Sequence, residues 1–317
     1  MGSARPGMAH PCIAPSQRWG SIGLLAMLAS CFLFSLLPLI VKLLNRFQPF
    51  ELVLWRSGVV SILITTICLC KGINPLGDAK DRLLLFGRGA GGFLFLVTYY
   101  HTVRLLPLSD AVVLCYTSPV MTAVAAKVLL GEQMGRLDVL GSLLCFVGVI
   151  LVSRPSFLRP FFGGPLEPLP SLGLLLALVA SVLNASVHLL LRYARHVHPL
   201  VSANYCALIS LPLCLAVKLS TGEPLAAPQG REWGLLLLFG LIAMGALILM
   251  SFGLAMETAG KATAMDYSQV AFSYMYSLLL LHQASSVQST IGAMLIATWG
   301  VIALLKEYYS NRHEPQD

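Results

Sequence analysis

The stretch LLPLSDAVVLCYTSPVMTAVAAKVLLGEQ, from Leu105 to Gln133, sets the fold class of this chain. It is long and apolar enough to cross a bilayer, whose hydrocarbon core of about 30 Å needs about 20 helical residues. It also holds an acid, a Tyr-Thr-Ser-Pro run and a lysine, which are costly side chains to place against lipid. We therefore expect a membrane helix in which Tyr116 to Pro119 face the interior of a helix bundle.

The composition of the whole chain is that of a membrane protein. Hydrophobic residues make up 57% of the 317 residues, charged residues make up 11%, and the mean hydropathy is +0.79, whereas a soluble domain carries about a quarter charged residues. The formal net charge of +7 comes from Lys and Arg scattered between apolar runs, so we expect no nucleic-acid partner. The eight cysteines show no metal-ligand spacing, so neither a metal nor a cofactor is expected.

Ten apolar segments meet or approach the length of a membrane span. The basic residues between them favour a cytosolic N-terminus, and an even number of spans then gives a cytosolic C-terminus. A polar leader, residues 1–19, precedes the first span, and a short tail, residues 307–317, follows the last. The expected spans are 20–44, 49–70, 82–104, 108–130, 137–153, 171–194, 199–219, 233–257, 261–281 and 285–306.

The two halves of the chain resemble each other at an offset of 150 residues. VLLGEQ, which ends at Gln133, then falls on LLLLHQ, which ends at Gln283. At the same offset Thr117-Ser118-Pro119-Val120 falls on Tyr267-Ser268-Gln269-Val270. This pattern indicates an internal repeat of five spans.

We accordingly predict a first repeat over residues 20–153 and a second over residues 171–306. The segment 154–170 is rich in Pro and Gly and joins them as a linker about which the halves rock. Because each repeat has an odd number of spans, the second enters the membrane in the opposite sense. Inverted repeats are typical of alternating-access transporters, with the substrate site between the halves near the bilayer midplane.

The sequence resembles the ten-helix drug/metabolite transporters with two EamA-type repeats, and among these it is most similar to the G-type members of solute carrier family 35. The residues that carry the resemblance are WRSGVV after Glu51, FGRGAGGFLFLVTYYHTVRLLPLSDAVVLCYTSPV from Phe86 to Val120, and VLLGEQ. They imply a fold, a transport mode and a central cavity over about residues 20–306. His282 departs from the pattern, which has an acid after the ninth span. No substrate is implied, because the superfamily carries nucleotide sugars, amino acids, carboxylates, purines and drugs.

The run from Gly87 to Gly92 matches the GxGxxG pattern of dinucleotide-binding folds, but that fingerprint needs a preceding strand and a soluble sheet. Inside a membrane helix, Gly87 and Gly91 instead form a GxxxG pair, which favours close helix packing. Arg88 and Arg56 lie at comparable depths from opposite sides, where a bare cation is costly. Either arginine binds an anionic group of a substrate through a forked hydrogen bond, or it binds helix carbonyls as a structural group.

Further polar residues on the expected spans are candidates for the substrate pathway. Pro119 removes a backbone donor, which breaks or kinks the fourth span. Four acids lie at helix ends, where capping and hydration explain them: Glu51, Asp110, Glu132 and Asp138. The candidate substrate-binding residues, besides the two arginines, are Tyr99, Tyr116, Thr117, Ser118, Asn184, His188, Asp266, Tyr267, Gln269 and Tyr274.

The hypothesis that follows is a multi-pass secondary transporter for a small polar organic solute, working by exchange or facilitated movement. An organic anion is favoured because deep basic residues outnumber deep acids. The expected partners are the lipid bilayer and this solute, and a homodimer stays open. Two alternatives remain: a regulatory or scaffold membrane protein with a vestigial cavity, and an integral-membrane enzyme, for which no GxSxG or HExxH motif is found.

Overall fold

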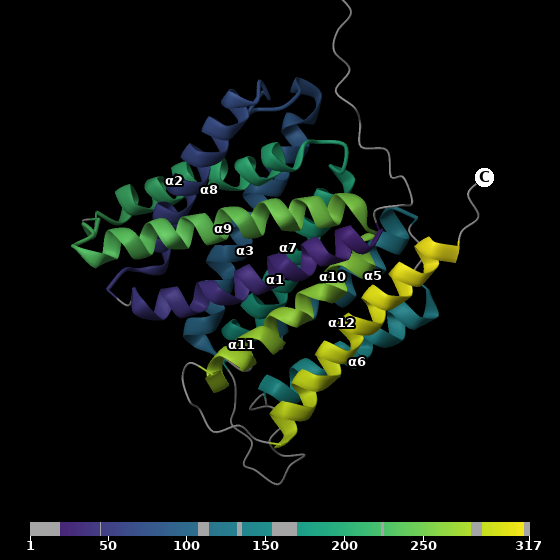
Figure 1. Cartoon of the computed structure of the whole chain (residues 1–317). Coiled ribbons are helices and arrows are strands. Elements are labelled where there is room, and N and C mark those ends of the chain that lie inside the picture. The colour runs from purple at the N-terminus through teal and green to yellow at the C-terminus, as the bar shows by residue number, and fades with distance from the viewer. Residues whose placement is uncertain are drawn as a thin grey trace, which may run out of the picture.

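A computed structural model describes residues 20–44, 46–106, 114–131, 135–153, 170–222, 225–279 and 287–313. Every regular element in these ranges is helical, which confirms the predicted all-α membrane fold (Figure 1). In chain order the elements are α1 (Gly20–Leu43), α2 (Pro49–Cys70), η2 (Ala79–Asp81), α3 (Arg82–Leu105), α5 (Ser118–Leu129), α6 (Arg136–Ser153), α7 (Ser171–Tyr193), α8 (Pro199–Thr221), α9 (Arg231–Met256), α10 (Ala259–Ala264), η4 (Met265–Tyr267), α11 (Ser268–Leu279) and α12 (Val287–His313).

Six of the described helices, α2, α6, α7, α8, α9 and α12, are long and apolar enough to cross a membrane. Shorter apolar stretches lie in α1, over Ile22–Leu37, and in α5, over Ser118–Leu129. α3 has the same 24-residue length as α1 but carries Arg88 in its interior. The chain is an integral, multi-pass membrane protein. The leader 1–19 and nearly all of the predicted linker, residues 154–169, lie outside the described residues.

The internal repeat is visible in the helix boundaries. α5 and α11 are both 12 residues long, and they begin at Ser118 and Ser268, which are 150 residues apart. α2 and α8 begin at Pro49 and Pro199, at the same offset. Proline suits this position because a backbone N–H in the first turn has no partner within the helix. The 150-residue offset between the two halves of the sequence is therefore also the offset between the starts of equivalent helices.

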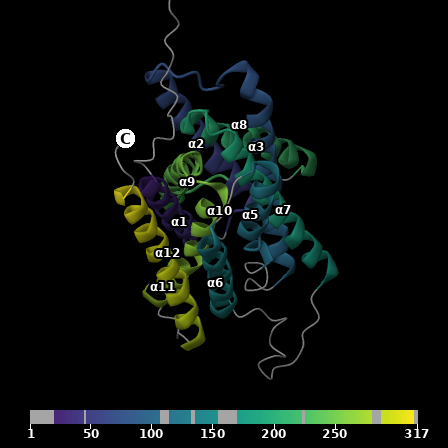
Figure 2. The ribbon, with the colours of Figure 1, turned by 90° about the vertical axis from the view of Figure 1, so that its right-hand side faces the viewer.

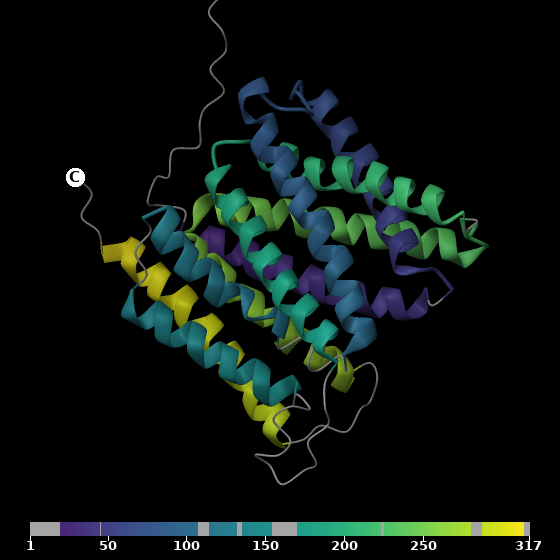
Figure 3. The same ribbon diagram turned by 180° about the vertical axis from the view of Figure 1, so that it is seen from behind.

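The helix contacts follow the same repeat and interleave the two halves. α1 packs on α9, and its counterpart α7 packs on α3; α2 and α8, which are counterparts, pack on each other, as do α6 and α12. The α2–α8 pair lies at one edge of the bundle and the α6–α12 pair at the opposite edge (Figures 1 and 3). Seen from the side, α1 and α9 lie on one side of α10, and α3 and α7 on the other (Figure 2). The central elements are therefore enclosed by helices from both repeats.

The fourth and ninth predicted spans are both interrupted at equivalent points. The ninth consists of α10, the 3₁₀ turn η4 and α11, so 261–281 is not one continuous helix. In the fourth, a turn at Tyr116 and Thr117 precedes α5, and Pro119 lies in the first turn of that helix. α5 and α10 pack together, so the two interruptions meet at the centre of the bundle.

Glycines allow the α6–α12 pair to pack closely. The indole of Trp299 lies directly over Gly141, and the backbones meet where Gly148 faces Gly292: a Cβ at Gly148 would come within 2.8 Å of the Gly292 carbonyl oxygen. α12 continues to His313, past residue 306, at which the sequence places the end of the last span. The start of α1 and the end of α12 lie at the same end of the bundle (Figure 1).

Candidate functional site

Arg88 is the most deeply buried charged side chain on α3. The residue is 1% exposed, and Nε, Nη1 and Nη2 all lack a hydrogen-bond partner among the described residues. The Cys206 thiol on α8 lies beside the guanidinium and interacts with it electrostatically. Gly89 lets the two helices approach, since a Cβ there would lie 2.7 Å from the Tyr205 carbonyl oxygen. A buried guanidinium without hydrogen-bond partners is costly, so this position needs a physical explanation.

The glycine that allows the closest helix packing on α3 is Gly89, whereas the sequence predicted this role for Gly87 and Gly91. A Cβ at Gly91 would lie 3.3 Å from Val187 on α7, which is a tight contact. A Cβ at Gly87 would lie 4.0 Å from Leu190, which is ordinary van der Waals contact. The literal spacing of a GxxxG motif thus misses the residue at which α3 comes closest to its neighbour.

Three ionisable side chains from three different elements lie at one depth in the bundle. Arg88 lies six residues after the start of α3, Asp266 lies seven residues after the start of α10, and His188 lies five residues before the end of α7. With a rise of 1.5 Å per residue, each is roughly 8–10 Å from its helix end. α3 and α10 enter the membrane from the side on which α7 leaves it, so these distances are measured from the same side.

His188 and Asp266 form a buried pair at this depth. His188 Nδ1 lies 3.5 Å from Asp266 Oδ2, and the two side chains are 5% and 9% exposed. Neither of these atoms makes a hydrogen bond in the described part of the chain. The other carboxylate oxygen, Oδ1, lies 3.7 Å from the Cys31 thiol, which donates to it. Arg88 lies near enough to His188 to act on it electrostatically, so the structure brings three of the predicted site residues together.

A polar stripe on α7 connects this cluster to the interruption before α5. Ser181, Asn184 and His188 are spaced by three and four residues and so share one face of the helix. Thr117 Oγ1 lies 2.6 Å from Ser181 Oγ, and Asn184 Nδ2 donates to Ser118 Oγ at 2.9 Å. The sequence did not single out Ser181, although its helical spacing from Asn184 and His188 on an otherwise apolar helix is a signal that would have found it.

Aromatic rings close the other side of the cluster. The rings of Tyr116 and Tyr267 lie at the two interruptions with centroids 6.1 Å apart, and Phe146 on α6 packs on Tyr267 at 6.4 Å. Tyr267 is fully buried, and its hydroxyl has no hydrogen-bond partner among the described residues. Tyr116 lies near enough to Asp266 and Tyr99 to interact with them electrostatically. The interruption at η4 therefore places two polar atoms without hydrogen-bond partners among the described residues, Asp266 Oδ2 and Tyr267 Oη, in the interior beside Tyr116.

The remaining predicted residues have varied surroundings. Gln269, on α11, donates to the Asp266 carboxylate and so belongs to the cluster. Arg56 is buried, but it lies near Cys214 on α8, seven residues from the opposite end of the bundle. Tyr274 Oη lies 2.8 Å from Thr290 Oγ1 and links α11 to α12. The ring of Tyr99 stacks on Phe95 within α3.

Two buried ion pairs near the helix ends correct the expectation that hydration explains their acids. Glu51 does accept the capping hydrogen bond from the Gln48 amide at 2.9 Å, but it is 2% exposed and also pairs with Lys218 Nζ on α8 at 3.0 Å. Asp138 is 6% exposed and pairs with Lys306 on α12 at 2.8 Å. Each partner lies on a counterpart helix more than 160 residues away, which local sequence patterns do not reveal.

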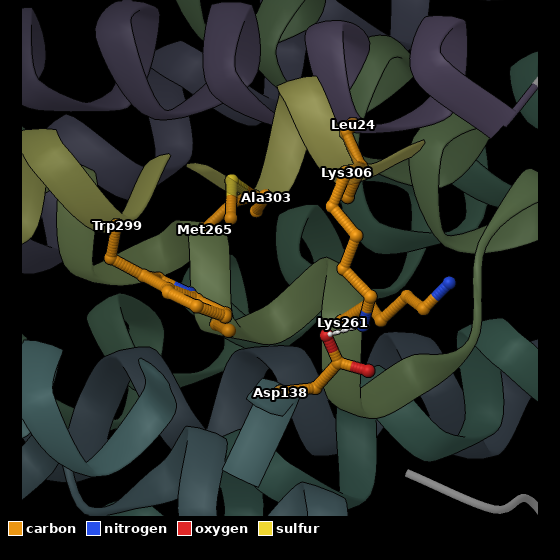
Figure 4. Close-up of a pocket in the computed structure, with 8 residues that line it drawn as sticks. Leu24, Asp138, Lys261, Met265, Trp299, Ala303 and Lys306 are labelled. Atoms are coloured by element: carbon orange, nitrogen blue, oxygen red, sulfur yellow. Dashed lines mark hydrogen bonds and ion pairs between the residues drawn. The ribbon is translucent and has the colours of Figure 1, made fainter. Parts of the chain in front are cut away.

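The Asp138–Lys306 pair borders a small cavity at the end of the bundle that holds the start of α1. The cavity measures about 10 Å³, which is close to the least space that holds one water. Figure 4 shows the Lys306 side chain reaching Asp138 at the cavity, with Trp299 set apart from this pair. Among the described residues there is no group of three His, Cys, Asp or Glu side chains that could hold a metal ion.

Comparison with known proteins places this architecture in a family. The model of the EamA-like transporter family matches residues 21–154 and again 171–305. A probable transport protein of Saccharomyces cerevisiae is 29% identical over 87% of this chain and 86% of its own length. Solute carrier family 35 member G1 of Homo sapiens is 26% identical over 92% of this chain and 80% of its own length.

Two further comparisons extend to bacteria and to solved structures. The pseudopaline exporter CntI of Pseudomonas aeruginosa is 27% identical over 86% of this chain and 92% of its own length. A solved crystal structure, 21% identical, superimposes with a TM-score of 0.76 over 91% of this chain and 98% of that one, which shows a shared fold. With both halves matched and its relatives named as transporters, the chain is a membrane transporter of the EamA-like transporter family, similar to the G-type members of solute carrier family 35.

Proposed function

We propose that this transporter carries a small organic anion, whose negatively charged group binds the Arg88 guanidinium between the two repeats. The observation that carries the proposal is that Arg88 is 1% exposed while Nε, Nη1 and Nη2 have no hydrogen-bond partner in the described part of the chain. A guanidinium offers five N–H donors in a planar fork, which matches the geometry of a carboxylate or phosphate. A bound anion would neutralise the charge and use these donors.

The polar groups around Arg88 support a solute that also carries neutral hydrogen-bonding groups. Thr117, Ser118 and Asn184 form a hydroxyl and amide surface at the start of α5. The hydroxyl of Tyr267 is buried and has no partner among the described residues. These groups donate and accept, so they suit hydroxyl, carbonyl or amide functions on the same molecule.

Alternating access is proposed to separate the ion pairs near the two ends in turn. Glu51–Lys218 joins α2 to α8 toward one end, and Asp138–Lys306 joins α6 to α12 toward the other. Each pair connects counterpart helices of the two repeats, so a rocking motion about the linker 154–170 would open one while the other stays closed. Both termini are proposed to face the cytosol, with the Asp138–Lys306 end on that side.

Thermal unfolding of the purified protein in detergent tests the proposal. A ligand at 100 times its Kd stabilises the folded state by about 2.7 kcal/mol, which raises Tm by several degrees at roughly 2–4 °C per kcal/mol. The probes are pyruvate, succinate, glutamate, UDP-glucose and xanthine, each added to native protein, Arg88→Ala and the matched control Arg46→Ala. Arg46 forms an exposed pair with Glu232, so its removal should leave ligand stabilisation unchanged.

The expected result is a rise in Tm with one class of anion, in the native protein and in Arg46→Ala but not in Arg88→Ala. An equal rise in all three proteins would remove Arg88 from the site. Stabilisation by xanthine alone, measured in a mildly acidic buffer in which xanthine is uncharged, would contradict the preference for an anion. No change in Tm with any of the probes would favour a scaffold protein with a vestigial cavity.

A further inference from the structure

The His188–Asp266 pair has binding capacity that an anion at Arg88 does not use. His188 Nδ1 and Asp266 Oδ2 are 3.5 Å apart, and both lack a hydrogen-bond partner among the described residues. A hydrogen bond between such atoms spans about 2.7–3.2 Å, so a small side-chain movement would let the two atoms share a proton. Both side chains are buried at the depth of Arg88. A proton bound here would lie within the transport pathway rather than at its rim.

The surroundings of the pair supply one fixed charge and several neutral groups. Arg88 acts on His188 from α3, while Cys31 on α1 and Gln269 on α11 contribute weak or neutral partners to Asp266. Other ionisable groups on the elements packed here have interactions of their own. The rings of Tyr116 and Tyr267 contact each other, and Cys145 on α6 lies near Tyr267. Asp138 on α6 pairs with Lys306 on α12, Arg192 on α7 donates to carbonyls of α9, and Glu257 and Lys261 also have interactions.

Charge neutrality inside the membrane links this pair to the anion. In the empty carrier, cationic Arg88 and anionic Asp266 sum to zero when His188 is neutral. A monoanion bound at Arg88 changes that sum to minus one, and a net charge that crosses the bilayer interior is costly. One proton added to the His188–Asp266 pair returns the sum to zero. The empty and the loaded carrier then both reorient without a net charge in the site.

We propose that the His188–Asp266 pair takes up one proton together with each anion, so that the protein is an electroneutral symporter of an organic monoanion and a proton. The proton comes from water on the side from which the anion enters, and it is held as an O–H on Asp266 or an N–H on His188. After reorientation the anion leaves Arg88, and the proton returns to water on the other side. This inference rests on the proposed function, because it requires an anion at Arg88.

Flux into sealed proteoliposomes tests the symport directly. The native protein is reconstituted, and uptake of radiolabelled pyruvate and glutamate is followed with equal pH on both sides and with an acidic exterior. One proton per anion predicts up to about tenfold greater accumulation per pH unit. For the monoanions, a membrane potential set with potassium and valinomycin should leave uptake unchanged. The gradient should no longer increase uptake by Asp266→Asn, whatever uptake that variant keeps at equal pH, and His188→Gln should weaken the response.

A matched variant separates this pair from buried acids in general. Asp138→Asn also removes a buried carboxylate, but at the Lys306 pair rather than at the site, so its ratio of uptake with and without the gradient should equal the native ratio. Saturable native uptake that ignores the pH gradient, or that follows the membrane potential, would overturn the symport and leave the anion site standing. An Asp266→Asn variant that keeps the native gradient response would also overturn it. Absence of native uptake for every anion would overturn both proposals.

Discussion

Replacing Arg88 by Met should stabilise the folded protein while abolishing anion binding. Arg88 is 1% exposed, and none of its three guanidinium nitrogens has a hydrogen-bond partner among the described residues. Each unsatisfied buried donor costs about 1–3 kcal/mol, and more when it is charged. A Met side chain has a similar length, fills irregular space and needs no partner. The substitution therefore removes a buried cation with unused donors rather than a hydrogen bond that holds the fold together.

The size of the gain follows from comparable substitutions. Replacing buried ionic groups by apolar residues of similar volume is neutral or stabilises by about 1–4 kcal/mol. At roughly 2–4 °C per kcal/mol, the Tm of Arg88→Met should exceed that of the native protein by several degrees. Without Arg88, the Asp266 carboxylate can bind a proton and become neutral, which limits the destabilisation caused by removing the nearby cation.

Arg192→Met is the matched control. Arg192 is also buried, in the last turn of α7, but its Nη1 donates to the Leu254 and Ala255 carbonyls at 3.3 and 3.0 Å. Its removal leaves carbonyls at the end of α9 without a donor and should cost about 1–3 kcal/mol. Unfolding in detergent, followed by intrinsic fluorescence and by light scattering, measures both variants. A fall in Tm for Arg88→Met comparable to that of the control would refute the reasoning and make Arg88 a structural residue.

Three further substitutions test the closed arrangement of the helices. Lys218→Met strips the buried Glu51 of its ion partner and should cost about 3 kcal/mol; because Glu51 keeps two backbone donors, adding Glu51→Gln should recover part of the loss in a double-mutant cycle. Gly141→Val drives a side chain into the indole that covers this residue and should cost at least about 1–3 kcal/mol, seen as a lower Tm and lower expression. Thr117→Val removes the 2.6 Å hydrogen bond to α7 and should cost about 1 kcal/mol, with substrate affinity reduced in the thermal panel.

The sequence predicted the architecture well because the architecture repeats. An offset of 150 residues is readable from short stretches such as VLLGEQ and LLLLHQ, and α5 and α11 reproduce it to the residue. Hydrophobic length alone placed eight of the ten predicted spans on single helices of the described residues, and the fourth and ninth are interrupted. The interruption at η4 was not predicted, since Ala-Met-Asp-Tyr has no strong helix breaker and the turn arises from packing against α1, α6 and α10.

The sequence indicated which residues belong to the candidate site, but not which of them lie next to each other. Burial depth along a span singles out Arg88, His188 and Asp266 one at a time, because each is expensive in lipid. Their meeting depends on how α3, α7 and η4 cross, which no local pattern encodes. The same limit explains why Lys218 escaped notice: it reads as a residue that anchors a helix end, while its buried partner Glu51 lies 167 positions earlier. Arg56 and Arg88 look alike in sequence, yet Arg88 acts on His188 whereas Arg56 lies near Cys214.

Counterflow across sealed vesicles tests the central claim most directly. Purified protein is reconstituted with unlabelled pyruvate, succinate or glutamate inside, and entry of the same labelled anion is measured in native protein and in Arg88→Ala. A carrier with one anion site between its repeats predicts saturable entry that is accelerated by the internal anion and lost in the variant. Entry that rises linearly with concentration and equals that of protein-free vesicles for every anion would contradict the account.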